Sequence, residues 1–266
     1  MKKIQFQLNT RMTDDKSKLL NYPTPISGQE DIPKWWRDGE AFLNKRDQSA
    51  NVENKEDRIA GMKGCMPFLD AMTSGYLILL WRSVEVAWDD DNKILLRQVV
   101  KDENGVWVED PAGEEYKSIG IREGDLGHTM PRPAGYNFTH LAWVSPWGVG
   151  SPKGWSVLVT HPLNRFELPF ITASGIIESD IFAANGNFPF FIKDGWSGVI
   201  EAGTPIAQVI PIKRSSWISE NKFGLSKKTM FYANAARAVD YGFYRSKAWV
   251  KKIYKTKDMG KINDVY

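Results

Sequence analysis

The sequence predicts a mainly β protein, folded as an antiparallel sandwich or a β-clip-like domain. Five short β-prone runs lie in the middle of the chain, at residues 155–160, 168–172, 188–192, 198–201 and 205–210. Turn-forming pairs such as Asn185-Gly186 and Asp194-Gly195 separate them, and no run between them has the length of an amphipathic helix. Short strands at even spacing with turns between them are typical of all-β sandwiches and barrels.

The first part of the chain adds strands and two short helical turns to this region. Residues 1–8 alternate polar and apolar side chains, as a first strand does. Pro33 and Pro67 each stand where a helix begins, because proline is favoured in the first turn. Residues 76–88 form the longest strand candidate, and residues 93–100 and 106–108 form a hairpin with Asn-Gly near its tip.

The last fifty residues have a different character. Residues 226–241 predict a helix with Ser226 as N-cap and Gly242 as its stop. Lysines and arginines alternate with aromatic residues after that, from Tyr244 to Lys261. We therefore expect a β domain over residues 1–217, with helical insertions at 31–47 and 66–74, and a C-terminal helix and basic arm over residues 218–266.

Composition limits the function classes. The net charge of +3 is nearly balanced and predicts no nucleic-acid partner for the whole chain, although the basic tail could contact phosphates. A single cysteine, Cys65, excludes an intrachain disulfide framework. No apolar run reaches the length of about eighteen residues that spans a bilayer, and the first residues lack the apolar block of a secretion signal. We expect an unsecreted protein with no membrane partner and no cofactor.

The three histidines are weak candidates for a metal site. His128, His140 and His161 are twelve and twenty-one residues apart, with no paired spacing on one helix or strand. Zinc and iron sites need two or three ligands that converge. Packing or turn-capping histidines are therefore favoured, and an iron-dependent oxygenase on a β-barrel is the least favoured hypothesis.

Two carboxylates are the better candidates for chemistry. Glu178 and Asp180 are two apart, so on a strand they would share a face. Two acids held together share a proton or bind magnesium, but they are equally typical of the solvated side of a strand. The sequence has no nucleophile elbow, no phosphate-binding loop and no dinucleotide fingerprint, which excludes a nucleotide hydrolase of the common loop type.

Four motifs in order resemble an uncharacterised domain-of-unknown-function family of tailed bacteriophages and some bacteria. They are the proline-started turn at residues 65–76, the run at 155–164, Gly-Ile-Ile-Glu-Ser-Asp at 175–180, and Gly-Thr-Pro-Ile-Ala-Gln-Val-Ile-Pro-Ile-Lys-Arg at 203–214. The resemblance covers residues 32–217. It implies a phage or phage-like origin, and with it a location in a virion or the host cytoplasm, and brings no established activity.

A second, smaller resemblance covers about forty residues. Residues 175–178 followed by 203–208 are similar to the late motifs of the β-clip dUTPase and dCTP deaminase group. That resemblance implies a turn that holds a pyrimidine deoxyribose and an acid that positions water. Position 178 is Glu where that group has Asp, the phosphate-binding Arg-Ser pair is missing, and no glycine-rich closing arm is present.

The leading expectation from sequence is a non-enzymatic phage protein, a structural or assembly component of the virion that contacts other protein subunits. The missing catalytic constellation, the many aromatic residues and the arm-like tail favour it. The alternative is a small-molecule enzyme or binder for nucleotides or pyrimidines. Glu178 and Asp180 would then be its acids, Gln208 a ligand contact and Arg214 a phosphate partner.

Overall fold

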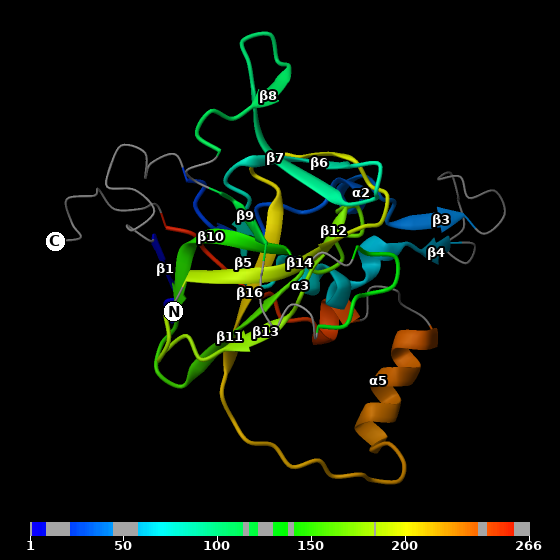
Figure 1. The fold of residues 1–266 in the computed structure, drawn as a ribbon. Helices are drawn as coiled ribbons and strands as arrows, with labels where there is room; N and C mark the ends of the chain where they lie inside the picture. Colours follow the sequence, from blue (N-terminus) through cyan, green and yellow to red (C-terminus); the bar gives the residue numbers. More distant parts are fainter. Residues whose placement is uncertain are drawn as a thin grey trace.

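The chain folds as antiparallel β-sheets that pack face to face (Figure 1). The computed structural model describes residues 2–8, 22–44, 58–113, 117–121, 130–137, 141–183, 185–238 and 244–257. Within these residues the strands form a five-stranded sheet, a second five-stranded sheet, a four-stranded sheet and a two-stranded hairpin. The mainly β, antiparallel fold class predicted from sequence is confirmed.

The first sheet has the order β1-β10-β14-β12, and β9 also pairs with β10. Its strands are β1 (Gln5–Leu8), β9 (Ile119–Ile121), β10 (Leu141–Gly150), β12 (Phe170–Thr172) and β14 (Asn185–Ile192). The second sheet has the order β13-β11-β16-β5-β2. Its strands are β2 (Ile26–Ser27), β5 (Tyr76–Leu79), β11 (Trp155–Thr160), β13 (Gly175–Ile177) and β16 (Pro205–Lys213).

The third sheet has the order β15-β6-β7-β8, and the small hairpin pairs β3 with β4. The strands are β3 (Phe42–Asn44), β4 (Arg58–Ala60), β6 (Ser83–Trp88), β7 (Ile94–Lys101), β8 (Trp107–Glu109) and β15 (Gly198–Ile200). The described helices are α2 (Lys34–Asp38), α3 (Met66–Thr73), α5 (Lys227–Ala238), a 3₁₀ turn (Met62–Gly64) and a π-helical turn (Tyr244–Ala248). Of the helices in the described ranges, none combines the length and the apolar character needed to cross a bilayer.

One core joins the three sheets. Trp143 of β10 is fully buried and stacks on Phe190 of β14, with ring centroids 3.6 Å apart. Val157 of β11 and Ile206 of β16 belong to the same buried cluster from the opposing sheet, and Val84 of β6 joins from the third. This aromatic-rich core is the sandwich interior that the alternating strands predict.

Two sequence expectations differ from the observed elements. Residues 76–88, expected as one strand, are two strands, because the chain changes sheets where Leu80 donates its backbone N–H to Thr204. Residues 146–152, expected as a connection, mostly continue β10. The prolines are accommodated because the pairing of β10 with β14 shifts register between Val144 and Gly148, which frees Pro146 from the ladder.

The helices in the structure are shorter than the sequence predicts. The helix expected to begin near Pro33 ends at Asp38 and is followed by β3, whereas α3 matches the expected turn at 66–74 closely. The Ser226 hydroxyl accepts the backbone N–H of Thr229 at 3.1 Å, as the predicted N-cap of α5 requires.

The division into a β domain and a C-terminal arm stays a prediction. Below, residues 2–213 are called the body and residues 214–257 the C-terminal extension.

Candidate functional site

The predicted residues Glu178, Asp180 and Arg214 come together at one edge of the second sheet. Arg214 follows the last residue of β16, and its Nη1 donates to Asp180 Oδ1 at 2.6 Å while Nη2 donates to Oδ2. The backbone N–H of Gly154 donates to the same carboxylate at 2.8 Å. This is the two-pronged geometry that makes arginine–carboxylate pairs specific.

The local fold explains why these groups converge. Among the described strands β13 pairs with β11 alone, and it ends at Ile177. The carbonyl of Glu178 then accepts the N–H groups of Ile181 and Phe182. This tight turn carries Asp180 back towards the end of β16. Strand β11 lies between β13 and β16 in the sheet, and its first residue lies opposite the end of β16. Arg214 and Asp180 therefore meet beside the beginning of β11.

Electrostatics at this edge follow from the pairing. The Arg214 guanidinium holds the pKa of Asp180 below its ordinary value, and the N–H of Gly154 acts in the same direction. The Asp180 carboxylate raises the pKa of Arg214, and the charge of Glu178 adds to this effect. Glu178 is exposed, whereas the Asp180 side chain is only 4% exposed. The cluster therefore holds one buried acid, one cation and one accessible acid.

Gln208 lies elsewhere and has a different environment. It is fully buried, its amide oxygen accepts the N–H of Leu163 at 2.8 Å, and its amide nitrogen donates to the carbonyls of Ala71 and Ser74. All the polar atoms of this amide are thus used to connect β16 to α3 and to the turn after β11. The predicted ligand contact at Gln208 stays a prediction, and the structure gives the side chain a role in the fold.

The three histidines do not form a described cluster. His161 is partly buried between Phe170 and the backbone: its Nδ1 accepts the N–H of Thr172 at 3.3 Å and its Nε2 lies 3.4 Å from the carbonyl of Arg165. Burial lowers the pKa of His161, which favours the neutral ring. His128 and His140 lie outside the described residues. Among the residues that are described, no three His, Cys, Asp or Glu side chains gather in a way that could hold a metal ion.

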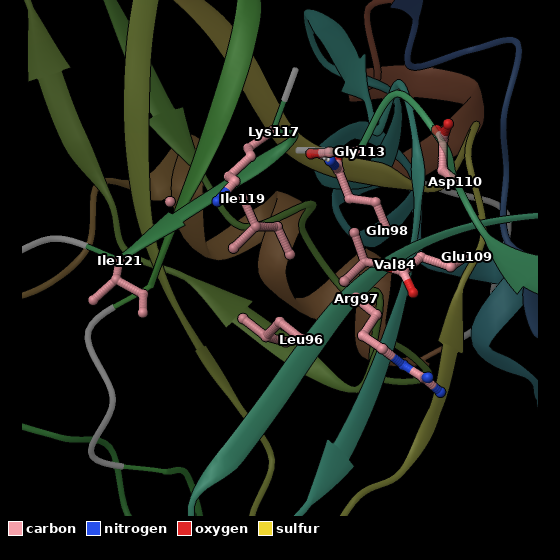
Figure 2. Close-up of a pocket in the computed structure, with 11 residues that line it drawn as sticks. Val84, Leu96, Arg97, Gln98, Glu109, Asp110, Gly113, Lys117, Ile119 and Ile121 are labelled. Atoms are coloured by element: carbon pink, nitrogen blue, oxygen red, sulfur yellow. Dashed lines mark hydrogen bonds between the residues drawn. The ribbon is translucent and has the colours of Figure 1, made fainter. Parts of the chain in front are cut away.

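A cleft of about 350 Å³ lies between the third sheet and β9 (Figure 2). Val84, Leu96, Ile119 and Ile121 form apolar walls, and Lys117 is the lysine at its rim. The Gln98 amide in the cleft is engaged by the carbonyl of Gly113 and the N–H of Ser118.

The positive charge of Arg97, which lines this cleft, is engaged by a carboxylate outside it. Arg97 pairs with Glu85, directly opposite it on β6, and its guanidinium extends away from Ile119 and Lys117 in Figure 2. None of the residues predicted as a site lines the cleft. Its size is that of a small-molecule site, and its lining is mixed, because Glu109 and Asp110 accompany the apolar residues. Gln98, Arg97 and Asp110 are already engaged in contacts within the body.

Sequence reasoning missed two groups, one that holds Asp180 and one on α3 that binds the C-terminal extension. Gly154 supplies an N–H to Asp180, and its backbone has a φ of +80°, which favours glycine. The Lys153-Gly154 turn after Pro152 was the available signal. Asp70 on α3 was also missed: it accepts the indole N–H of Trp249 and pairs with Lys252 of the C-terminal extension. No spacing pattern in the sequence predicts this contact, because Asp70 and Trp249 are far apart along the chain.

Comparisons with known proteins give structural matches only. No protein-family model matches the chain, and no curated protein matches it in sequence. The chain is similar in structure to the dUTPase from phage phi11 of S. aureus, with a TM-score of 0.33, 9% identity, and coverage of 85% of this chain and 99% of that one. It is also similar to the dUTPase of Staphylococcus bacteriophage 80alpha, with a TM-score of 0.31, 9% identity, and coverage of 85% and 99%.

These findings correct the leading expectation from sequence. The solved structures that the chain resembles are dUTPases, which are enzymes, and not structural components of a virion. The expectation of a non-enzymatic virion component was wrong, and we do not carry it further. The predicted phage family of unknown function gains no support from the family comparison. The phage source of the matched structures agrees with the phage character expected from sequence.

Proposed function

We propose that the protein binds a pyrimidine nucleotide at the edge formed by β13 and the Asp180–Arg214 pair, and that it hydrolyses the phosphate chain there. The observation that carries the proposal is the convergence of Glu178, Asp180 and Arg214 at a sheet edge.

Arg214 has the properties of a phosphate contact. Its side chain is 35% exposed, and the pair with Asp180 engages one N–H on each terminal nitrogen. A guanidinium has five N–H donors in a fixed fork, so three remain for a ligand. Because Asp180 and Gly154 fix the orientation of the guanidinium, a phosphate would meet a donor set that is already in position.

Glu178 has the properties of the group that orients water. It is exposed at the end of β13, and it is near enough to Arg214 to affect its pKa. A carboxylate beside a bound phosphate can accept a proton from an attacking water molecule. Asp180 is less suited to this role because its oxygens already accept bonds from Arg214 and Gly154.

The free edge of β13 supplies the contacts expected for a base. Gly175 and Ile176 are exposed and lie at the end of the sheet order, so the outer backbone groups of the strand have no neighbouring strand among those described. Such an edge offers N–H and C=O groups that can pair with a planar ligand as they would with another strand. A pyrimidine, with donors and acceptors along one side, fits this pattern.

The test begins with thermal unfolding in the presence of dUTP, dCTP, dTTP, dUMP and ATP, each with magnesium. A nucleotide at one hundred times its dissociation constant stabilises a protein by about 2.7 kcal/mol. We expect this for a pyrimidine nucleotide and expect release of phosphate or pyrophosphate in the same samples. No stabilisation and no release with any nucleotide would contradict the proposal.

Two variants locate the site. Glu178→Gln should retain the nucleotide-dependent shift and lose hydrolysis, since it keeps the size of the side chain and removes the base. Arg214→Lys should weaken binding, because an ammonium cannot keep the fork with Asp180 and also donate to a phosphate. Glu103→Gln in the β7–β8 turn and Arg37→Lys on α2 are the matched controls, both exposed and both remote from β13. Equal effects of variants and controls would place the activity elsewhere.

A further inference from the structure

The C-terminal extension leaves the body, runs through solvent and returns to it (Figure 1). Residues 215–226 contain no helix or strand, and α5 follows them to one side of the sheets. Every residue from Lys213 to Ala248 whose burial is described is exposed, except Ala233. The body therefore does not cover this part of the chain.

Large apolar side chains are concentrated in this uncovered stretch. Six of them lie within fifteen residues, with these exposed fractions: Trp217 88%, Ile218 97%, Phe223 110%, Leu225 60%, Met230 49% and Phe231 66%. Burying one such side chain contributes about 1.5–3 kcal/mol. Soluble monomers rarely leave that much apolar surface together in water, and where they do it marks a docking surface.

Charge separates the two parts of the molecule. Residues 214–266 hold twelve Lys and Arg against four Asp and Glu, a net charge of +8. The whole chain carries +3, so residues 1–213 carry −5. A partner that suits the extension should therefore be acidic with some exposed apolar surface. The body meets this description, with Ile181 and Phe182 80% and 67% exposed beside Asp180.

The end of the extension already shows how it recognises the body. Trp249 donates its indole N–H to the Asp70 carboxylate at 3.0 and 3.1 Å, and Lys252 pairs with the same carboxylate. Thr256 accepts the backbone N–H of Ser27 at 3.0 Å and donates to Glu30 at 2.8 Å. These contacts join a basic, aromatic segment to acidic residues of the body, and they satisfy the same groups whichever copy supplies the segment.

We infer that the C-terminal extension docks on a second copy of this chain, with residues 249–257 of each copy bound at the Asp70 and Glu30 surface of the other. Exchange of an identical element preserves its contacts and so forms a dimer at low cost. The exchange would also bring the exposed apolar residues from Trp217 to Phe231 against the body of the second copy.

A cross-linking experiment on the full chain distinguishes exchange from docking within one copy. In a Cys65→Ser background, one tagged chain carries Glu30→Cys and a differently tagged chain carries Thr256→Cys, the two residues joined by the 2.8 Å bond. After mixing and treatment with a short bis-maleimide, exchange predicts a covalent heterodimer that contains both tags. Asp91→Cys, exposed in the β6–β7 turn, replaces Glu30→Cys in the control pair.

The outcomes decide the inference in either direction. A heterodimer absent from the Asp91 control, with a native mass near twice 30.2 kDa by light scattering, supports it. A monomeric chain, or a cross-link that forms only inside a chain carrying both cysteines, overturns it. A gain in mass that requires added oligonucleotide also overturns it, because the basic extension would then bind nucleic acid and not a second copy of the chain.

Substitutions in the extension provide a second measurement that does not depend on folding of the body. Trp217→Ser combined with Phe223→Ser should shift the native mass to that of a monomer, while Leu95→Ser, at an apolar residue of β7 that is 48% exposed, should leave it unchanged. Raising the salt to about 1 M should also favour the monomer, since exposed charges are then screened beyond about 3 Å. A dimer that survives the double substitution contradicts the inference.

Discussion

The body and the C-terminal extension use the same kinds of side chain in opposite ways. In the body, Trp143 has no exposed surface, stacks on Phe190, and donates its indole N–H to Thr172. In the extension, Trp217 is 88% exposed and Phe223 is fully exposed. Aromatic content alone therefore does not mark a core, and the difference lies in whether neighbouring strands surround the ring.

The two regions also differ in the contacts that hold them in place. The body is held by apolar burial between sheets and by polar groups that are nearly all paired. The extension is held at its far end by the carboxylate of Asp70 and by the Ser27 and Glu30 contacts. We expect substitutions in the body to change the free energy of unfolding, and substitutions in the extension to change assembly.

The largest expected effect is that of Trp143→Ala. Removing a fully buried indole leaves a cavity between β10, β12 and β14, and such substitutions lower the free energy of unfolding by about 3–5 kcal/mol. Urea denaturation followed by tryptophan fluorescence and circular dichroism measures it. Trp217→Ala is the matched control and should stay within about 0.5 kcal/mol for a monomeric sample. Similar losses for both would remove the distinction between the two regions.

A smaller loss is expected for Gln208→Leu. The substitution leaves the N–H of Leu163 and two carbonyls, those of Ala71 and Ser74, without their partners in a buried site. An unsatisfied buried polar group costs about 1–3 kcal/mol. The control is Gln29→Leu, whose amide donates to the carbonyl of Lys252 in the extension and is partly exposed. Its effect on the unfolding of the body should be well below that of Gln208→Leu.

Much of the body follows from the sequence. The residues of β11 were predicted with both ends correct, and the turn at α3, the β7–β8 hairpin and the Ser226 cap were placed within one or two residues. These elements succeed because their information is local: alternation of side chains, turn residues and a capping hydroxyl act over a few residues. The sheet change near Leu80 was missed because it depends on Thr204, far along the chain.

The candidate site was predictable in part for the same reason. Glu178 and Asp180 were expected to share one face of a strand, but β13 ends at Ile177 and both residues lie in the turn that follows, with Glu178 exposed and the Asp180 side chain buried. Arg214 follows from the motif that contains it. The pairing of Arg214 with Asp180 depends on how β13, β11 and β16 are ordered in the sheet, which no local pattern encodes. The fully buried state of Gln208 is likewise a property of its tertiary neighbours, so its motif position alone favoured a ligand contact.

The response to pH should also differ between the two regions. Burial lowers the pKa of His161 in the body, so the folded state resists protonation more than the unfolded chain does. The resulting stability is present above the unfolded pKa of about 6.5 and is lost as the pH falls below it. Unfolding measured between pH 7.5 and pH 5 should show this decline. His161→Gln, which does not titrate, should flatten it, and an unchanged slope would assign the decline to other groups.

The extension should respond at the opposite end of the pH range. Asp70 raises the pKa of Lys252, so the contribution of this pair to docking is present below the unfolded lysine pKa of about 10.4 and is lost as the pH rises through the folded value. The docked segment should therefore be stable where the His161 effect acts. Limited proteolysis after Lys251 and Lys255, compared at pH 6 and pH 8, should give the same rate at both.

The smallest expected effect on stability is that of Trp249→Ala. The indole N–H is bound to a carboxylate at the periphery of the body, which is 17% exposed, and peripheral contacts of this kind contribute about 0–1 kcal/mol. Unfolding of the body should hardly change, yet proteolysis of residues 249–257 should become faster and the cross-link between positions 30 and 256 should weaken. Trp107→Ala, on β8 at the other end of the molecule, is the control and should leave the cross-link intact. A marked fall in the unfolding free energy with Trp249→Ala would show that the extension belongs to the same cooperative unit as the body, because a segment that docks independently can be released without loosening the sheets.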